Sequence, residues 1–205
     1  MGSDPASRTE GSDPTGLTPV VPRDFFARDV CVVAGDLVGA TLLLDGVGGV
    51  VVETEAYGPD DPASHSFTGP TSRNRTMFGP PGRLYVYRSY GIHWCANLVC
   101  GVEGVGAAVL LRALEPTSGL DVMQARRGVE DAKLLCSGPG RLTQALGITL
   151  AHDGLRVDRP PFTLEPSPLV DVVAGPRVGI TRAAERPWRY ALRGSPFVSR
   201  PRPRP

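Results

Sequence analysis

The stretch that decides the fold is Gly49-Val-Val-Val-Glu-Thr-Glu-Ala-Tyr57, which is rich in β-branched residues and follows a glycine-rich turn signal. This composition predicts a β-strand. Because successive side chains on a strand point to opposite faces, Glu53, Glu55 and Tyr57 share one face. Two carboxylates about 7 Å apart on one face are costly to bury without partners. The face is therefore either exposed to solvent or part of a functional site.

The sequence on both sides of this stretch predicts further strands. A turn beginning at Asp45-Gly46 joins it to a strand over 41–44, and a helical region covers 24–38. Further strand-like runs cover 84–87, 92–99 and 107–114. Residues 58–82 form a long loop dense in Gly, Pro and Ser, and a loop of this length inside a compact domain is usually functional or disordered.

Two helices are predicted after the strands. The first covers about 118–127, with Ser118 and Asp121 placed as a capping box and Gly128 as its stop. The second opens at Pro139, a favoured first-turn residue, and ends near Gly147. Helices packed on an antiparallel sheet make an α+β fold.

A chain of 205 residues fits one domain better than two, and its composition excludes collagen-like, coiled-coil and wholly disordered classes. Residues 1–21 are rich in Gly, Pro, Ser and acids and predict a disordered leader. Residues 200–205 alternate Arg and Pro, which predicts an unstructured tail. The expected single domain is 22–199.

The formal net charge of +1 argues against a nucleic-acid partner, because DNA-binding domains are usually strongly basic. The distribution of charge favours the opposite interpretation. Residues 62–102 contain four arginines and no acid, and residues 176–205 contain eight arginines against Glu185. These arginines are either a solvated surface or two phosphate-binding segments.

The four cysteines, Cys31, Cys95, Cys100 and Cys136, form no CxxC pair, and three of them lie in apolar runs. Buried free thiols in a reducing compartment are therefore expected rather than a metal site. No cofactor is expected. The N-terminus lacks the pattern of a secretory signal and no apolar run approaches the length of a membrane span. We expect an intracellular, cytoplasmic protein, associated with the nucleoid if it is bacterial.

The segment from Arg73 to Gly91 interleaves arginines with aromatic residues. Tyr85 is expected in an aromatic core, whereas Tyr90, beside a glycine where a hairpin turns, is expected to be exposed. An exposed aromatic tip can wedge between base pairs while guanidinium groups hold phosphates. The candidate phosphate contacts are Arg73, Arg75, Arg88 and, at the start of the second helix, Arg141.

Arg112 interrupts the apolar strand Ala107–Leu114 and needs an anionic partner, for which Glu55 is a candidate and another acid the alternative. Asn97 similarly interrupts the strand over 92–99, where a turn or edge role is the simpler explanation. The segment Cys136-Ser-Gly-Pro-Gly-Arg-Leu142 could hold a phosphate on free backbone N–H groups, although simple helix entry explains it equally well.

Taken together, these segments resemble the alkyladenine (3-methyladenine) DNA glycosylases found in mammals and many bacteria. The resemblance runs from about Asp24 to Ser199 and is carried by Glu-Thr-Glu-Ala-Tyr57, Arg73-Asn-Arg75 and Leu84-Tyr-Val-Tyr87. It implies a single α+β domain in which helices surround a curved antiparallel sheet and a β-hairpin protrudes. It also implies base-excision repair: flipping of alkylated or deaminated purines out of duplex DNA, followed by hydrolysis of the N-glycosidic bond.

The resemblance implies a role for each matched residue. Glu55 corresponds to the general base that activates water, and Arg112 and the carbonyl of Val178 correspond to groups that hold that water. The base pocket corresponds to Tyr57, His65, Tyr87 and Asn97, and the intercalating tip to Tyr90 with Met77 beside it. The local departures, His93-Trp94 and Val99, bear on the shape of the pocket and hence on substrate range.

Lys133 is the only lysine and lies outside every matched motif, so we expect a monofunctional glycosylase without lyase activity. The expected partner is double-stranded DNA containing damaged purines, with no membrane association, bound by a monomer. Two other functions fit parts of the sequence. A non-catalytic reader of damaged DNA would leave Glu55 and Arg112 without a role, and a nucleoside hydrolase would leave the arginine-rich hairpin without one.

Overall fold

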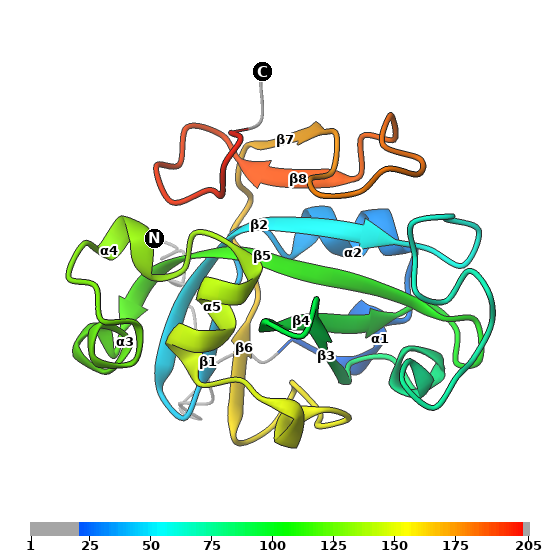
Figure 1. The fold of residues 1–205 in the computed structure, drawn as a ribbon, viewed down its shortest axis with the longest axis horizontal. Coiled ribbons are helices and arrows are strands. Elements are labelled where there is room, and N and C mark those ends of the chain that lie inside the picture. The colour runs from blue at the N-terminus through cyan, green and yellow to red at the C-terminus, as the bar shows by residue number, and fades with distance from the viewer. Residues whose placement is uncertain (1–20, 203–205) are drawn as a thin grey trace, which may run out of the picture.

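The computed structural model describes residues 21–202, which form helices around one curled antiparallel sheet (Figure 1). The strands are β1 (Thr41–Leu44), β2 (Val47–Tyr57), β3 (Leu84–Ser89), β4 (His93–Cys100), β5 (Ala107–Ser118), β6 (Phe162–Glu165), β7 (Val172–Gly175) and β8 (Arg189–Leu192). The helices are α1 (Arg23–Phe26), α2 (Val30–Asp36), α3 (Leu120–Arg127), α4 (Ala132–Leu135) and α5 (Pro139–Leu146), with short 3-10 helices at Arg75–Phe78 and Leu150–His152. The α+β fold is confirmed.

The sheet curls because its long central strand, β2, changes neighbour along its length. The order is β3-β4-β5-β2-β1-β6, all antiparallel. On the other side from β5, residues 47–50 of β2 pair with β1, whereas Glu53–Glu55 pair with β8. The register between β2 and β5 also shifts on both sides of Glu53, and irregularities of this kind bend a strand. The predicted curvature is thus centred on the carboxylate-bearing stretch.

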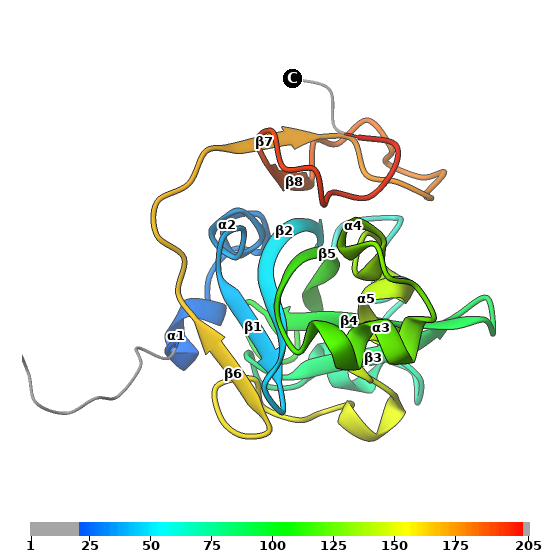
Figure 2. The same cartoon turned by 90° about the vertical axis from the view of Figure 1, so that its left-hand side faces the viewer.

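Strands β3 and β4 form the predicted hairpin, which projects from the body of the fold (Figure 2). Its turn contains Tyr90 with φ 49° and Gly91 with φ 70°. Consecutive positive φ values suit a tight hairpin turn, whose twist matches that of the strands. The side chain of Tyr90 is 88% exposed, which confirms the expectation drawn from its place beside a glycine.

Helices α2 and α5 pack on the sheet through short apolar faces. Asp29 caps α2 by accepting from the backbone N–H groups of Cys31 and Val32. Pro139 begins α5 and Gly147 ends it with φ 78°, as predicted. The buried residues of α5 are Leu142, Thr143, Ala145 and Leu146.

The predicted capping box at Ser118 and Asp121 is wrong. Ser118 is the last residue of β5, where it pairs with Gly48, and its hydroxyl donates to the carbonyl of Gly46 at 2.6 Å. Helix α3 instead starts after Gly119, which has φ 69° and lies too close to Val47 to carry a side chain. Cross-strand pairing therefore outcompetes the local capping signal.

The ends of the fold differ slightly from the expected 22–199. Val21, which we placed in the leader, is buried, and its N–H donates to the carbonyl of Leu164. Pro201, which we placed in the tail, accepts a hydrogen bond from Arg189 at 2.8 Å. The rest of the predicted leader, 1–20, and residues 203–205 lie outside the described residues.

Candidate active site

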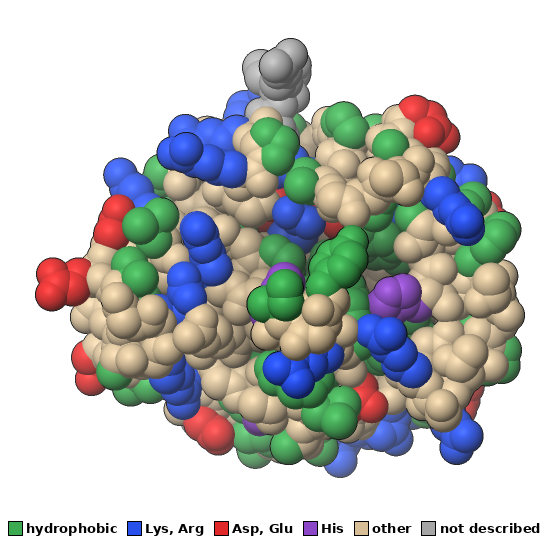
Figure 3. Space-filling view, in the orientation of Figure 1, with side chains coloured by type: hydrophobic (Ala, Val, Ile, Leu, Met, Phe, Trp, Pro, Cys, Tyr) green, Lys and Arg blue, Asp and Glu red, His purple; other side chains and the backbone are tan. Residues whose placement is uncertain are grey.

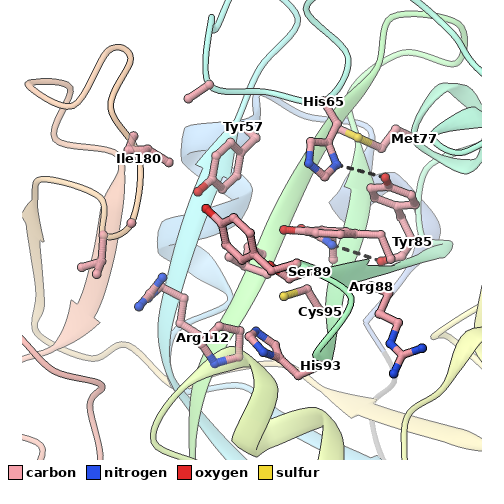
Figure 4. Close-up of a pocket in the computed structure, with 18 of the residues that line it drawn as sticks. Tyr57, His65, Met77, Tyr85, Arg88, Ser89, His93, Cys95, Arg112 and Ile180 are labelled. Atoms are coloured by element: carbon pink, nitrogen blue, oxygen red, sulfur yellow. Dashed lines mark hydrogen bonds between the residues drawn. The ribbon is translucent and has the colours of Figure 1, made fainter.

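A cavity of about 660 Å³ opens between the hairpin, the central strands and the segment after β7 (Figure 4). It brings together residues that are up to 123 positions apart in the chain, from Tyr57 to Ile180. The lining includes most of the predicted site residues: Tyr57, His65, Tyr87, Asn97, Arg112 and Val178. Tyr85 and Cys95, to which we had given no role at the site, also line it, as does His93, which we expected to bear on the shape of the pocket.

Glu55 lies directly behind this lining and is fully buried. Its Oε1 accepts a hydrogen bond from the backbone N–H of Val178 at 2.7 Å and lies 3.2 Å from Nη1 of Arg112. Its Oε2 accepts from the hydroxyl of Tyr57 at 2.9 Å. An ionised carboxylate has about four lone-pair sites, so these three partners leave about one acceptor site unused. The expected pairing of Arg112 with Glu55 is confirmed.

Glu53 forms a second buried cluster that we had not predicted. One of its oxygens accepts from Nε of Arg112 at 2.8 Å and from Nε of Arg189 at 2.7 Å. The same oxygen, Oε1, accepts from the hydroxyl of Ser199 at 2.8 Å, and Oε2 accepts from the backbone N–H of Ser199 at 2.5 Å. Arg112 therefore bridges the two carboxylates, so the alternative partner considered for Arg112 is also present. The only sequence signal for this cluster was an arginine at 189 between aromatic and apolar residues.

The guanidinium of Arg112 is held in its charged form. Burial alone would lower its pKa, but the neighbouring carboxylates of Glu55 and Glu53 outweigh that effect and raise the pKa above its usual value. The two carboxylates thus face two buried cations, Arg112 and Arg189. A charge-balanced cluster of this kind avoids the cost of burying an unpaired ion.

One wall of the cavity is aromatic. The rings of Tyr85 and Tyr87 are stacked with centroids 5.6 Å apart, and the ring of His65 meets that of Tyr87 edge-on at 4.4 Å. His65 Nδ1 lies 3.1 Å from the hydroxyl of Tyr85. Tyr85 is buried in the aromatic cluster where we expected it. The wall offers flat, electron-rich surfaces to a planar ligand.

The titratable groups of the wall are kept neutral. Burial raises the pKa of Tyr57 and of Tyr87 well above the usual value, and the charge of Glu55 raises that of Tyr57 further. Burial raises the pKa of Tyr85 to about 12. The pKa of His65 is lowered by burial and then by the positive charge of Arg73. At neutral pH the wall is therefore uncharged.

The loop over 58–82 is shaped by Asn74, which presents His65 to the cavity. Asn74 is buried, and its amide donates to the carbonyl of His65 at 2.8 Å and to that of Gly69 at 3.1 Å. Its side-chain oxygen accepts from the backbone N–H and the hydroxyl of Thr71. The predicted long loop is therefore ordered by an internal polar network.

Asn97 is buried on β4, opposite Tyr85 of the neighbouring strand, and its amide donates to the Tyr85 carbonyl at 3.1 Å. This position is in the middle of the sheet, because β4 pairs with both β3 and β5. The simpler turn or edge role is therefore wrong. A buried amide that also lines the cavity can discriminate among polar groups on a ligand.

The turn end of the hairpin is braced against α5 through the first residues of β4. The hydroxyl of Thr143 donates to the carbonyl of Trp94 at 2.8 Å. The ring of His93 packs directly against Gly140, so that a Cβ added to this glycine would lie only 2.5 Å from the ring. The glycine of the Gly-Pro-Gly run thus serves close packing between helix and hairpin. Met77 is 3% exposed and packs with Tyr85, and it lines the cavity together with Tyr90, so its role beside the intercalating tip stays a prediction.

Basic side chains lie on both sides of the hairpin, while most acidic side chains on this face of the molecule lie near the edge of the face (Figure 3). The four candidate phosphate contacts, Arg73, Arg75, Arg88 and Arg141, are all exposed. The second basic segment differs from expectation. Arg177 and Arg189 are buried with Asp61 and Glu53 and tie the C-terminal segment to β2 and the loop after it, and Arg193 forms an exposed pair with Asp171.

Within residues 21–202, no three His, Cys, Asp or Glu side chains gather in a way that could hold a metal ion, and all four cysteines are free thiols. None of the described helices has the length and apolar character required to cross a bilayer.

A family model described as methylpurine-DNA glycosylase matches residues 24–196 of the chain. Proteins of Rhodopseudomonas palustris strains HaA2 and BisB18 are 59% and 63% identical to it; the alignments cover 96% and 90% of this chain and 98% and 93% of those proteins. A protein of Nitrosospira multiformis is 62% identical, over 87% of this chain and 92% of its own. All three bear the provisional name 3-methyladenine DNA glycosylase. These matches confirm the resemblance seen in the sequence: the chain belongs to the methylpurine-DNA glycosylase family.

Proposed function

We propose that this chain is a DNA repair glycosylase that flips alkylated or deaminated purines out of duplex DNA and hydrolyses their N-glycosidic bond with a water activated by Glu55. The observation that carries the proposal is the placement of Glu55. It is a buried carboxylate with about one free acceptor site, behind a cavity with an aromatic wall and an exposed aromatic tip beside it. Family membership and the names of the relatives support the same reaction.

Cleavage of an N-glycosidic bond passes through a transition state in which positive charge develops on the sugar. As a carboxylate, Glu55 stabilises the positive charge that develops on the sugar while the bond from C1′ to the base nitrogen breaks and its electron pair leaves with the base. Glu55 takes a proton from the water as the water oxygen bonds to C1′. Arg112 and the Val178 backbone orient the carboxylate and the water for attack on the sugar. Oriented charge of this kind costs no reorganisation when the reaction occurs.

The aromatic wall supports selection of damaged bases. Alkylation makes a purine cationic, and a cation over the face of a tyrosine gains about 0.5–2 kcal/mol. Tyr57 and Tyr87 supply such faces, and neutral His65 adds no repulsion. Asn97 is the residue we assign to rejection of guanine by contact with its exocyclic amino group.

Binding of the duplex is assigned to the hairpin. Tyr90 fills the gap that the flipped nucleotide leaves, and Arg73, Arg75, Arg88 and Arg141 contact phosphates. Extruding a base costs a few kcal/mol, and least for one that is damaged or mispaired. The wedge and the phosphate contacts offset that cost.

The reaction is proposed to stop at base release. Lys133, the only lysine, lies on α4 and does not line the cavity, so it is not placed to attack the sugar as an amine. Borohydride treatment during the reaction should trap no covalent protein–DNA adduct. An adduct would contradict the monofunctional assignment.

The test uses duplexes with one hypoxanthine or one 3-methyladenine, incubated with the wild type and with Glu55→Gln, followed by alkaline cleavage at abasic sites. The wild type should produce the cleaved strand, and Glu55→Gln should bind the duplex without producing it. Binding by the wild type with no release from any lesion would instead indicate a damage reader. Release from free nucleosides without salt-sensitive duplex binding would indicate a nucleoside hydrolase.

A further inference from the structure

We infer that Arg177 is a positioning residue: paired with Asp61, it holds the Val178 N–H on Glu55 and supports the ring of Tyr57 from behind. The inference rests on the proposed function, because it concerns the same carboxylate. It adds two buried residues to the machinery that orients Glu55.

The guanidinium of Arg177 ties together three parts of the chain. Its Nη1 donates to the carbonyl of Ala56 at 2.9 Å and to Asp61, and its Nη2 donates to Asp61 at 3.0 Å and to the carbonyl of Ala183 at 3.3 Å. The side chains of Arg177 and Asp61 are fully buried. Only a planar fork with several donors can make all of these contacts at once.

These contacts fix the position of the neighbouring Val178. Ala56 directly follows Glu55 on β2, so the bond from Arg177 to Ala56 holds the 177–178 backbone beside the carboxylate. Among the described residues, 176–182 make no backbone–backbone hydrogen bond to the sheet. The 2.7 Å bond from Val178 to Glu55 therefore depends on the side chain of Arg177 for its geometry.

Arg177 also lies against Tyr57. Its guanidinium carbon is 4.7 Å from the centre of the Tyr57 ring and 5.3 Å from that of Trp188. Tyr57 donates the other hydrogen bond to Glu55, through its hydroxyl. Two of the three partners of Glu55 thus rest on one guanidinium, whose charge is balanced by Asp61.

The experiment measures single-turnover base release from a hypoxanthine duplex between pH 5 and 9, together with binding of an uncleavable lesion duplex. The test variant is Arg177→Met combined with Asp61→Asn, which removes both charges at similar volume. Arg177→Lys is the conservative variant. The charged and titratable groups around Glu55 that any pH effect must take into account are Glu53, Tyr57, Tyr87, Cys95, Arg112 and Arg177.

We expect the double variant to lose on the order of 100-fold in rate, the size of effect seen when one oriented donor is removed from an active site. Duplex binding should stay within about threefold, because neither residue is exposed to DNA. The acid side of the pH–rate profile should move to higher pH, since a carboxylate that loses a donor is protonated more easily. Arg177→Lys should fall between the double variant and the wild type.

Leu164→Ala is the matched control. Leu164 is fully buried on β6, away from the cavity lining, so its truncation destabilises the fold without touching the site. Its rate and pH profile should equal those of the wild type at a temperature where both are folded. If the double variant folds, a wild-type rate and an unshifted pH–rate profile would overturn the inference. If the double variant does not fold, a wild-type rate and an unshifted profile in Arg177→Lys would overturn it.

Hydrogen exchange at the Val178 amide provides a readout that needs no activity. Exchange should be faster in the Arg177 variants than in Leu164→Ala, and equal protection would also refute the positioning role. If the wild type releases no base from any lesion, the proposed function fails, and amide exchange still decides whether Arg177 positions Val178.

Discussion

The hydroxyl of Tyr57 donates a hydrogen bond to Oε2 of Glu55 at 2.9 Å, although the two residues are only two positions apart on the same strand. Side chains at i and i+2 lie on one face of a strand, so this contact follows from the local geometry of β2. The ring of Tyr57 lines the cavity (Figure 4), and its hydroxyl donates to the carboxylate behind that lining. One residue thus links the pocket wall to the proposed base.

This link predicts the effect of Tyr57→Phe, which keeps the ring and removes the donor. A hydrogen bond to a charged group contributes about 1.5–3 kcal/mol, so single-turnover base release should fall about 10- to 100-fold. Binding of lesion duplex should change little. The control is Tyr190→Phe. Tyr190 lies on β8 and packs near Gly35 of α2, so this variant should keep the wild-type rate. Weaker binding with an unchanged rate in Tyr57→Phe would contradict the assignment.

Glu53→Gln should destabilise the fold strongly. The change leaves Arg189 buried without its carboxylate and weakens the hold on Arg112 and Ser199. Breaking a buried pair by removing one partner costs about 3–5 kcal/mol. Asp36→Asn, which breaks the exposed pair with Arg28, should cost less than about 1 kcal/mol. Chemical denaturation measures both, and equal losses would show that burial of the Glu53 cluster contributes nothing.

Tyr90→Gly should separate stability from activity. Tyr90 has φ 49° and is 88% exposed, so glycine relieves backbone strain and removes no core contact. We expect the free energy of unfolding to change by less than about 1 kcal/mol. Base release from paired lesions should fall, and release from lesions in single strands should fall less, since a wedge matters only where a duplex gap must be filled. Equal losses on both substrates would exclude the wedge role.

Gly140→Ala should displace the hairpin. The new Cβ would meet the ring of His93 at 2.5 Å, which is closer than non-bonded carbon atoms approach. We expect weaker duplex binding and slower base release, with partial recovery in Gly140→Ala combined with His93→Ala. Gly175→Ala, where a Cβ meets nothing within 4 Å, is the control and should behave as the wild type. No recovery in the double variant would show that His93 is not the obstacle.

His65 should titrate below its ordinary pKa of 6.5, because burial and then the charge of Arg73 disfavour its protonated form. The neutral form of His65 contributes to folding stability above about pH 6.5. That contribution is lost as the pH falls, because the unfolded chain binds the proton more tightly than the folded protein does. Arg73→Ala should raise the pKa of His65 in an NMR titration, whereas Arg75→Ala should leave it in place. A pKa above 6.5 in the wild type would contradict this placement.

Much of the fold could be predicted because its signals are local. The alternation at 49–57, the turn chemistry at Tyr90-Gly91 and the start of α5 at Pro139 each depend on a few neighbouring residues. The capping box at Ser118 failed because strand pairing with Gly48, 70 positions earlier, competes with it. The burial of Met77 could not be predicted for a related reason: it depends on packing with Tyr85, Val99 and Ala108 rather than on its place near the arginines.

Sequence alone determined that Glu53, Glu55 and Tyr57 lie on one face of a strand and that an arginine on another strand needs an acid. Tertiary structure decided which carboxylate has which role. Glu53 is enclosed by Ser199, 146 positions away, and Glu55 is held by Val178, 123 positions away. Those partners reach β2 only because β8 pairs with its second half, which brings the C-terminal segment over one face of the curled sheet. Contacts so distant along the chain are set by how the sheet closes, and no local pattern in the sequence encodes that closure.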